Sequence, residues 1–223
     1  MIICEEKAFE RILSLGFCDT AIPITIRQEI GRDAEITVLP SLKKVAQKLE
    51  KQFAGKFFDI ETHNFLRREI RPFMDSIGYL DNRQSRKITV IMTRDNSITL
   101  PCSDSVILDA PIKNNTTADI ESLIEFGHIV AAKIVDGAVV ACAYTDLNPQ
   151  GCEYVEIGVE TAPAYRHKGY AKSVLQTLIS RLNELDIKPV YITSAHNKAS
   201  LKLAKSLGFE AEAFEYNYVF RRK

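Results

Sequence analysis

The chain has 223 residues, of which 46% are hydrophobic and 26% charged, values typical of a protein that buries a core. Lys plus Arg and Asp plus Glu number 29 each, and the signs are also balanced within residues 1–85 and within residues 86–223. This balance argues against a nucleic-acid partner, and no apolar run approaches the roughly 18 residues that cross a membrane. We therefore expect a protein that binds neither.

The amino terminus has no basic start followed by an apolar run, and the five cysteines are scattered without a CxxC pair. Both features predict a cytoplasmic protein in a reducing environment. The four histidines are too dispersed for a metal-ligand motif, so no metal is expected. They are His63, His128, His167 and His196.

The first third of the chain is predicted to be rich in helix. Apolar residues recur at helical spacing over residues 6–17, 40–55 and 62–78, and each segment ends near a glycine. Pro72 is expected to kink or divide the third helix. Residues 34–40 are expected to form a short strand between the first two helices.

From about Arg86 onward the pattern predicts mainly strands. Expected strands cover residues 87–93, 105–110, the two arms of a hairpin over 128–145, then 153–159, 188–194 and the aromatic tail 212–222. The hairpin is predicted from the dipeptide Asp136-Gly137. Short helices are expected over residues 117–127 and 197–208, with Thr117 and Asn197 as their N-caps.

A basic loop stands between the strand at 153–159 and a strongly periodic helix. The loop reads Arg166-His167-Lys168-Gly169-Tyr170-Ala171. At such a helix start, unpaired N–H groups and the helix dipole together attract anions. Gly169 would let the backbone approach a phosphate with no Cβ in the way. The loop therefore predicts an anion site.

In loop sequence and in the order of its elements, the segment 127–223 resembles the GNAT superfamily of acetyl-CoA-dependent N-acetyltransferases. The resemblance rests on the Arg/Gln-x-x-Gly-x-Gly/Ala loop at Arg166–Ala171, on Asn197 and Ser200 in a later helix, and on Gly208-Phe209 at its end. It implies an α/β fold with a mixed, mostly antiparallel central sheet flanked by helices. We place this domain at residues 96–223, after a helix-rich N-terminal region at 1–95.

The resemblance also implies which residues hold acetyl-CoA. The loop amides would bind the pyrophosphate, and pantetheine would pair with the backbone of the strand end as an added strand does. Arg166, His167 and Lys168 have side chains that either add charge or are merely solvated, and Asn197 either reaches the coenzyme or only caps its helix. The implied set is Val159, Glu160, Thr161, Arg166, His167, Lys168, Gly169, Tyr170, Ala171, Asn197 and Ser200.

Acetyl transfer to an amine needs a base, because an alkylammonium with a pKa of ~10.4 is almost wholly protonated at pH 7. Glu156 is the candidate base, with a structural or substrate-positioning role as the alternative; Glu153 and Glu160 are weaker candidates. Ala204 stands where many relatives have a proton-donating tyrosine.

The expected function is transfer of an acetyl group from acetyl-CoA to a primary amine of a small molecule or a protein. The alternatives are a non-catalytic acyl-CoA-binding module, which Ala204 favours, and an acyltransferase that uses a longer acyl chain. Residues 1–95 are expected to form the acceptor side or a lid.

Overall fold

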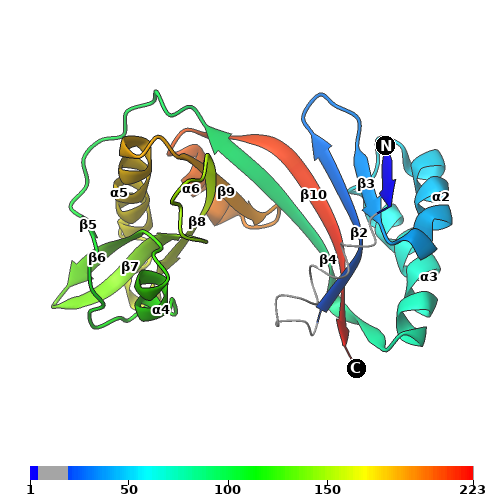
Figure 1. Ribbon diagram of the computed structural model, residues 1–223, viewed down its shortest axis with the longest axis horizontal. Coiled ribbons are helices and arrows are strands. Elements are labelled where there is room, and N and C mark those ends of the chain that lie inside the picture. The colour runs from blue at the N-terminus through cyan, green and yellow to red at the C-terminus, as the bar shows by residue number, and fades with distance from the viewer. Residues whose placement is uncertain (5–19, 223) are drawn as a thin grey trace. The chain divides into compact units, whose positions relative to one another are not determined.

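The computed structural model describes residues 1–4 and 20–222, which form two compact units (Figure 1). The first unit comprises Met1–Val90, Ser194–His196 and Glu212–Lys223, and the second comprises Ile91–Thr193 and Asn197–Ala211. The helix predicted at residues 6–17 lies outside the described residues. The proposed division at residues 95 and 96, and the role of residues 1–95, stay predictions.

The first unit is a sheet with two helices packed on it (Figure 1). Its strands are β1 (Ile2–Cys4), β3 (Glu35–Val38), β2 (Thr20–Glu29) and, beyond β2, parts of β10 (Phe209–Arg222) and β4 (Tyr79–Arg94), in that order. The helices are α2 (Lys43–Phe53), preceded by the 3-10 turn η1 (Pro40–Leu42), and α3 (Ile60–Ser76). The fully buried side chains of this core include Ile24, Ile26, Ile36, Leu49, Leu66, Ile70, Tyr216, Tyr218 and Phe220.

The predictions for this region are partly confirmed. The helices over 40–55 and 62–78 and the strand within 34–40 are present, but β1 and β2 were not predicted. Pro23 explains the omission of β2, because proline lacks the N–H that a central strand donates. Pro72 was expected to kink or divide the third helix. Helix α3 runs without interruption through Pro72, so the proline does not divide it.

The second unit contains strands in the order β10 and β4 (parts of each), β9 (Lys188–Ser194), β8 (Tyr154–Thr161), β7 (Ala138–Thr145), β6 (Val130–Val135) and β5 (Val106–Ile107). The pairings β5–β6, β6–β7 and β7–β8 are antiparallel, and β8–β9 is parallel. Helix α5 (Tyr170–Glu184) and the short helix α4 (Ile120–Glu125) cover opposite faces of β6–β8 (Figure 1), and α6 (Lys198–Lys205) follows β9. The predicted α/β class and mostly antiparallel sheet are confirmed.

Local signals in this unit were mostly correct. Asp136 and Gly137 have φ values of 50° and 74°, as a tight hairpin between β6 and β7 requires. Asn197 caps α6 by accepting a hydrogen bond from the Ser200 N–H at 3.1 Å. The predicted N-cap Thr117 was wrong, because Asp119 caps α4 through the N–H of Ser122.

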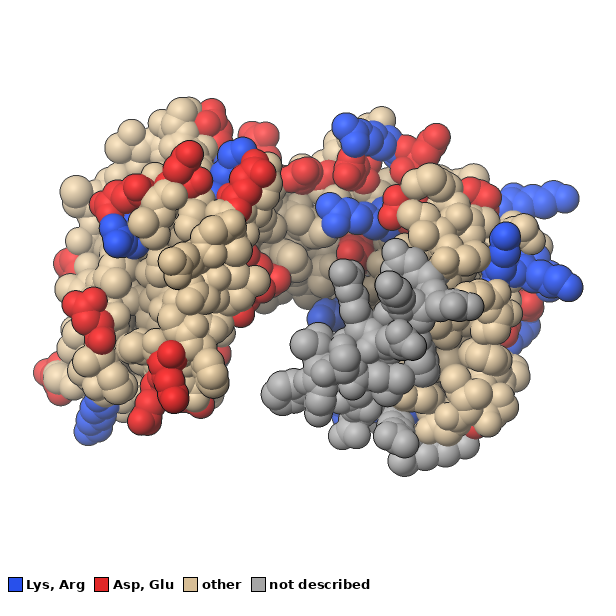
Figure 2. Space-filling model, viewed as in Figure 1, with Lys and Arg blue, Asp and Glu red and all other residues tan. Residues whose placement is uncertain are grey.

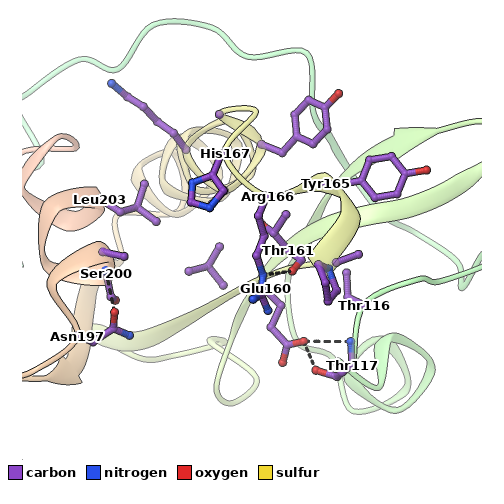
Figure 3. Close-up of a pocket in the computed structure, with 18 of the residues that line it drawn as sticks. Thr116, Thr117, Glu160, Thr161, Tyr165, Arg166, His167, Asn197, Ser200 and Leu203 are labelled. Carbon is purple, nitrogen blue, oxygen red and sulfur yellow. Dashed lines mark hydrogen bonds between the residues drawn. The ribbon is translucent and has the colours of Figure 1, made fainter.

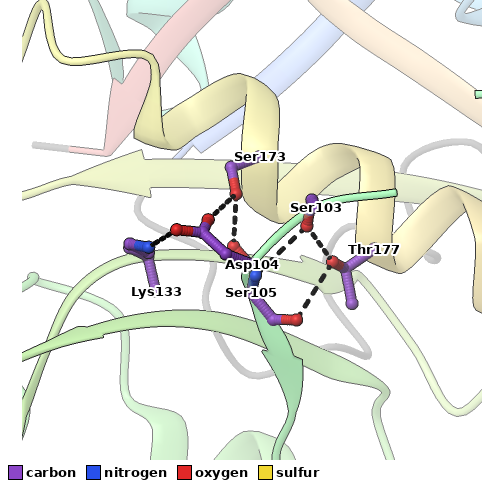
Figure 4. Close-up of polar contacts among 6 residues, drawn as sticks. All are labelled: Ser103, Asp104, Ser105, Lys133, Ser173 and Thr177. Carbon is purple, nitrogen blue, oxygen red and sulfur yellow. Dashed lines mark hydrogen bonds and ion pairs between the residues drawn. The ribbon is translucent and has the colours of Figure 1, made fainter. Parts of the chain in front are cut away.

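Hydroxyl groups tie the segment before β5 to α5, as Figure 4 shows. Ser103 bonds the hydroxyl of Thr177, and the Oγ atoms of Ser105 and Ser173 lie 2.6 Å apart. Asp104 accepts a hydrogen bond from Ser173 at 3.1 Å and forms an ion pair with Lys133 of β6. These contacts fix the helix whose first turn borders the site described below.

We expect Thr177→Val to lower the free energy of unfolding by about 1 kcal/mol, because the isosteric change removes the hydrogen bonds of the Thr177 hydroxyl with the Ser103 hydroxyl and the C=O of Ser105. Chemical unfolding followed by far-UV circular dichroism measures this, since the chain has no tryptophan. The matched control is Ser180→Ala on the exposed face of α5, which should change stability little. Equal effects of the two substitutions would contradict the role of the hydroxyl contacts.

Candidate coenzyme site

A cavity of about 570 Å³ lies in the second unit where β8 and β9 separate. The two strands pair only as far as Glu156 and Val190, although β8 continues to Thr161 and β9 continues past Tyr191. Figure 3 shows Thr161, Arg166 and His167 on one side of the cavity and Asn197, Ser200 and Leu203 of α6 on the other. The site is therefore a wedge opened between two neighbouring parallel strands.

The wedge exposes backbone hydrogen-bonding groups of β8. The C=O of Glu156 and the N–H of Ala162 are bonded on the β7 side, to Asp146 and Val140. Backbone groups of a strand alternate between its two edges, so Ile157, Val159 and Thr161 direct theirs to the edge that β9 has left. Val159 and Thr161 both line the cavity. An extended ligand can pair with this edge.

The loop after β8 supplies a second set of donors. After a 3-10 turn, η2 (Pro163–Tyr165), His167 and Gly169 adopt positive φ values of 62° and 81°, and Gly169 is the N-cap of α5. No side chain caps this helix, and its first backbone bond runs from the N–H of Ser173 to the C=O of Gly169. The N–H groups of the first turn thus have no intrahelical acceptor, an arrangement that favours an anion.

All the predicted coenzyme residues except Lys168 line this cavity. The Lys168 ammonium lies instead over the ring of Tyr165, 4.9 Å from its centroid. Asn197 caps α6 and also borders the cavity, so both interpretations given for it are compatible with the structure. Whether these residues bind acetyl-CoA stays a prediction.

The sequence analysis missed Tyr191, whose hydroxyl lies 2.8 Å from that of Ser200 inside the cavity. Burial raises the pKa of the Tyr191 phenol, so it is protonated near neutral pH. The alternation of residues 188–194 could have revealed its inward position. Asn115 and Thr116 were also missed, because they lie in a loop with no motif.

Glu156 lies half-buried at the narrow end of the wedge, where pairing of β8 with β9 ends. Alternation along the strand puts it on the same face as Gly158 and Glu160. This face carries Tyr144 of β7: burial raises the pKa of the Tyr144 phenol, and the carboxylates of Glu160 and Glu156 raise it further. Glu156 is not among the residues that line the cavity. Its assignment as the base stays a prediction.

Two other groups are chemically inert. Burial raises the pKa of the Cys142 thiol to about 11, so this cysteine is no nucleophile near neutral pH. Ala204 is completely buried and has no proton to donate. Neither the sulfur nor the usual position of the tyrosine acid contributes chemistry in this chain.

Charged side chains are interspersed on the surface of the second unit. On the face that Figure 2 shows, Lys and Arg do not gather into one basic area. In the described part of the chain, no helix combines the length and the hydrophobicity needed to cross a bilayer.

Residues 126–219 match the family model described as GNAT acetyltransferase. No curated protein matches the chain.

Solved structures with a similar fold include a GNAT-family protein from Novosphingobium aromaticivorans, with a TM-score of 0.51 and 22% identity over 62% of this chain and 66% of that one. A GCN5-related N-acetyltransferase-like protein from Streptococcus suis matches with a TM-score of 0.44 and 19% identity over 68% and 67%. An acetyltransferase of the GNAT family from Colwellia psychrerythraea matches with a TM-score of 0.46 and 15% identity, over 82% of this chain and 76% of that one. The match to the Novosphingobium aromaticivorans protein shows the fold alone. This chain covers slightly less than two thirds of that protein.

We expect iodoacetamide at pH 8 to modify Cys142 about 100-fold more slowly than the exposed Cys102, because so little of a thiol with a raised pKa is thiolate. Peptide mapping by mass spectrometry at successive times measures both rates in one sample. Similar rates for the two cysteines would show that Cys142 is accessible and ionised, and would reopen a covalent mechanism.

Proposed function

We propose that the second unit transfers an acetyl group from acetyl-CoA to a primary amine. The observation that carries the proposal is the meeting, in one cavity, of the free edge of β8 with the uncapped start of α5. The free edge of β8 suits an extended chain with amide groups, and the start of α5 suits a phosphate. Coenzyme A contains both groups, a diphosphate and an extended pantetheine chain with amides.

The residues present fit the coenzyme. The N–H groups of the first turn of α5 would hold the diphosphate, with Arg166 and Lys172 beside it as cations. A Cβ built on Gly169 would meet nothing within 4 Å, so the space beside its backbone is open to a phosphate oxygen. The backbone of Val159 would accept from and donate to the pantetheine amides, and the N–H of Thr161 would donate, whereas the C=O of Thr161 already accepts a hydrogen bond from Arg166 Nε at 3.3 Å.

In the proposed reaction the acceptor ammonium first loses a proton to Glu156, directly or through water. The amine nitrogen then attacks the thioester carbonyl, whose oxygen is stabilised by a backbone N–H of the β8 edge near Val159. The carbon–sulfur bond breaks with its electron pair on sulfur, the nitrogen releases its second proton to solvent, and the thiolate takes a proton from solvent. The products are an N-acetylated amine and free coenzyme A.

A second candidate function is binding of acyl-CoA without catalysis. Its support is Ala204, which is buried and offers no proton to the leaving thiolate. A thiolate can leave without prior protonation, however, and so we favour the enzyme. The length of the acyl chain is a separate question that the coenzyme loop does not decide.

Gly169→Ala should raise the Kd for coenzyme A at least about tenfold. The methyl would occupy the open space at the anion site, and φ of 81° is strained for alanine by roughly 1 kcal/mol. The matched control is Gly151→Ala, because Gly151 has φ of 78° and equally open surroundings but lies outside the cavity. Calorimetric titration would contradict the site if both variants bound coenzyme A as the unaltered chain does.

Glu156→Gln should lower kcat about 100-fold or more at pH 7 and progressively less toward pH 10, where the free amine no longer needs a base. Release of free thiol from acetyl-CoA, followed across this pH range, measures the effect. Glu184→Gln, an equal charge change at the exposed end of α5, serves as the control. A constant ratio of rates at every pH would reject Glu156 as the base.

A further inference from the structure

A second cavity of about 340 Å³ lies in the same unit, between α4 and the face of β7 and β8. It shares Thr117 and Glu160 with the coenzyme cavity. A molecule in this cavity would therefore lie beside the wedge in which the thioester is proposed to sit. The following inference rests on that proposed function and concerns what occupies the second cavity.

The charges that line the second cavity are acidic. Glu160 accepts hydrogen bonds from the N–H of Thr117, at 3.1 Å, and from its hydroxyl. Asp119 accepts from the N–H and hydroxyl of Ser122 at 3.2 and 2.8 Å, and these bonds lower its pKa. Among the described residues no lysine or arginine lines this cavity. It therefore complements a cation and has no partner for a carboxylate.

The rest of the lining is largely apolar. Leu123 and Ala118 of the α4 region are partly buried and pack against the small core beneath the cavity, and Phe126, just after α4, is 67% exposed. An apolar ligand that covers an exposed phenylalanine removes apolar surface from water, and this burial favours binding. The acceptor thus needs an apolar body as well as a positive charge.

Tyr144 connects the second cavity to the wedge. A Cβ built on Gly158 would lie only 2.7 and 2.8 Å from two carbons of the Tyr144 ring, so the ring rests directly on the β8 backbone. Tyr144 lines the second cavity, and Gly158 immediately precedes Val159 of the free edge. Glycine at position 158 is what permits this close approach.

His128 completes the lining with a hydrogen-bond acceptor. Its Nδ1 lies 2.6 Å from the C=O of Thr145, which can only accept, so Nδ1 of the neutral ring carries the hydrogen. In the neutral tautomer with the hydrogen on Nδ1, Nε2 has a lone pair that would accept a hydrogen bond from an ammonium group. The cavity thus combines carboxylate, imidazole and aromatic surfaces.

We infer that the second cavity binds the acceptor, and that the acceptor is a primary ammonium compound with an apolar body and no carboxylate. Glu160 holds the ammonium group at the boundary with the coenzyme cavity. Tyr144, Leu123 and Phe126 surround the apolar body. Glu160 and Phe126 are therefore the residues that set acceptor specificity, whereas Glu156 is the proposed base.

The test compares phenethylamine with phenylalanine, which has the same ring and amine but adds a carboxylate. With the full chain and saturating acetyl-CoA, thiol release should give a kcat/KM at least tenfold higher for phenethylamine. Glu160→Gln should reduce that preference several-fold, because it removes the charge that attracts ammonium and repels carboxylate. Phe126→Ala should raise KM for phenethylamine at least threefold and leave KM for acetyl-CoA unchanged.

Glu125→Gln is the matched control, because Glu125 is exposed on the same helix and lines neither cavity. A ratio of two kcat/KM values is insensitive to partial misfolding, so the readout does not depend on equal folding of the variants. Equal or better use of phenylalanine, or an unchanged preference in Glu160→Gln, would overturn this inference and leave the acetyltransferase proposal standing. Absence of thiol release with both amines and with lysine and peptide amines, despite binding of coenzyme A, would overturn both.

Discussion

The early end of pairing between β8 and β9 is the constraint on which the site depends. Buried backbone N–H and C=O groups must find partners, yet beyond Glu156 and Val190 the two strands no longer supply them to each other. On its other edge β8 is paired with β7 from Ile157 to Thr161, which keeps this part of the strand extended. A ligand that pairs with Val159 and Thr161 would therefore complete the hydrogen bonding of an otherwise regular strand.

The start of α5 lies beside this open edge and favours a ligand that has an anionic group next to an extended chain. Two residues with positive φ, His167 and Gly169, bend the chain so that the first turn of the helix borders the wedge. The helix is held in turn by the hydroxyl contacts of Ser103 and Ser105 with Thr177 and Ser173. Anion site, strand edge and supporting contacts thus form one continuous arrangement within the second unit.

Features set by local chemistry could be predicted from the sequence. The hairpin at Asp136-Gly137, the left-handed turn at Gly169 before α5 and the cap at Asn197 each depend on residues close together in the chain. Contacts that depend on how two strands are aligned with each other could not be predicted. The contact of Tyr144 with Gly158 joins two strands, and no local pattern reveals it. Thr117 has the chemistry of a helix cap, but Glu160, 43 residues later, takes its hydrogen bonds.

Amide chemical shifts of the ¹⁵N-labelled chain, recorded with and without coenzyme A, test the central claim most directly. Binding should shift the amides of Val159, Thr161 and the first turn of α5 together, and leave that of Gly137 in the distant hairpin unchanged. Shifts confined to other parts of the chain, or nuclear Overhauser contacts showing that β8 and β9 stay paired past Glu156 and Val190, would contradict the account.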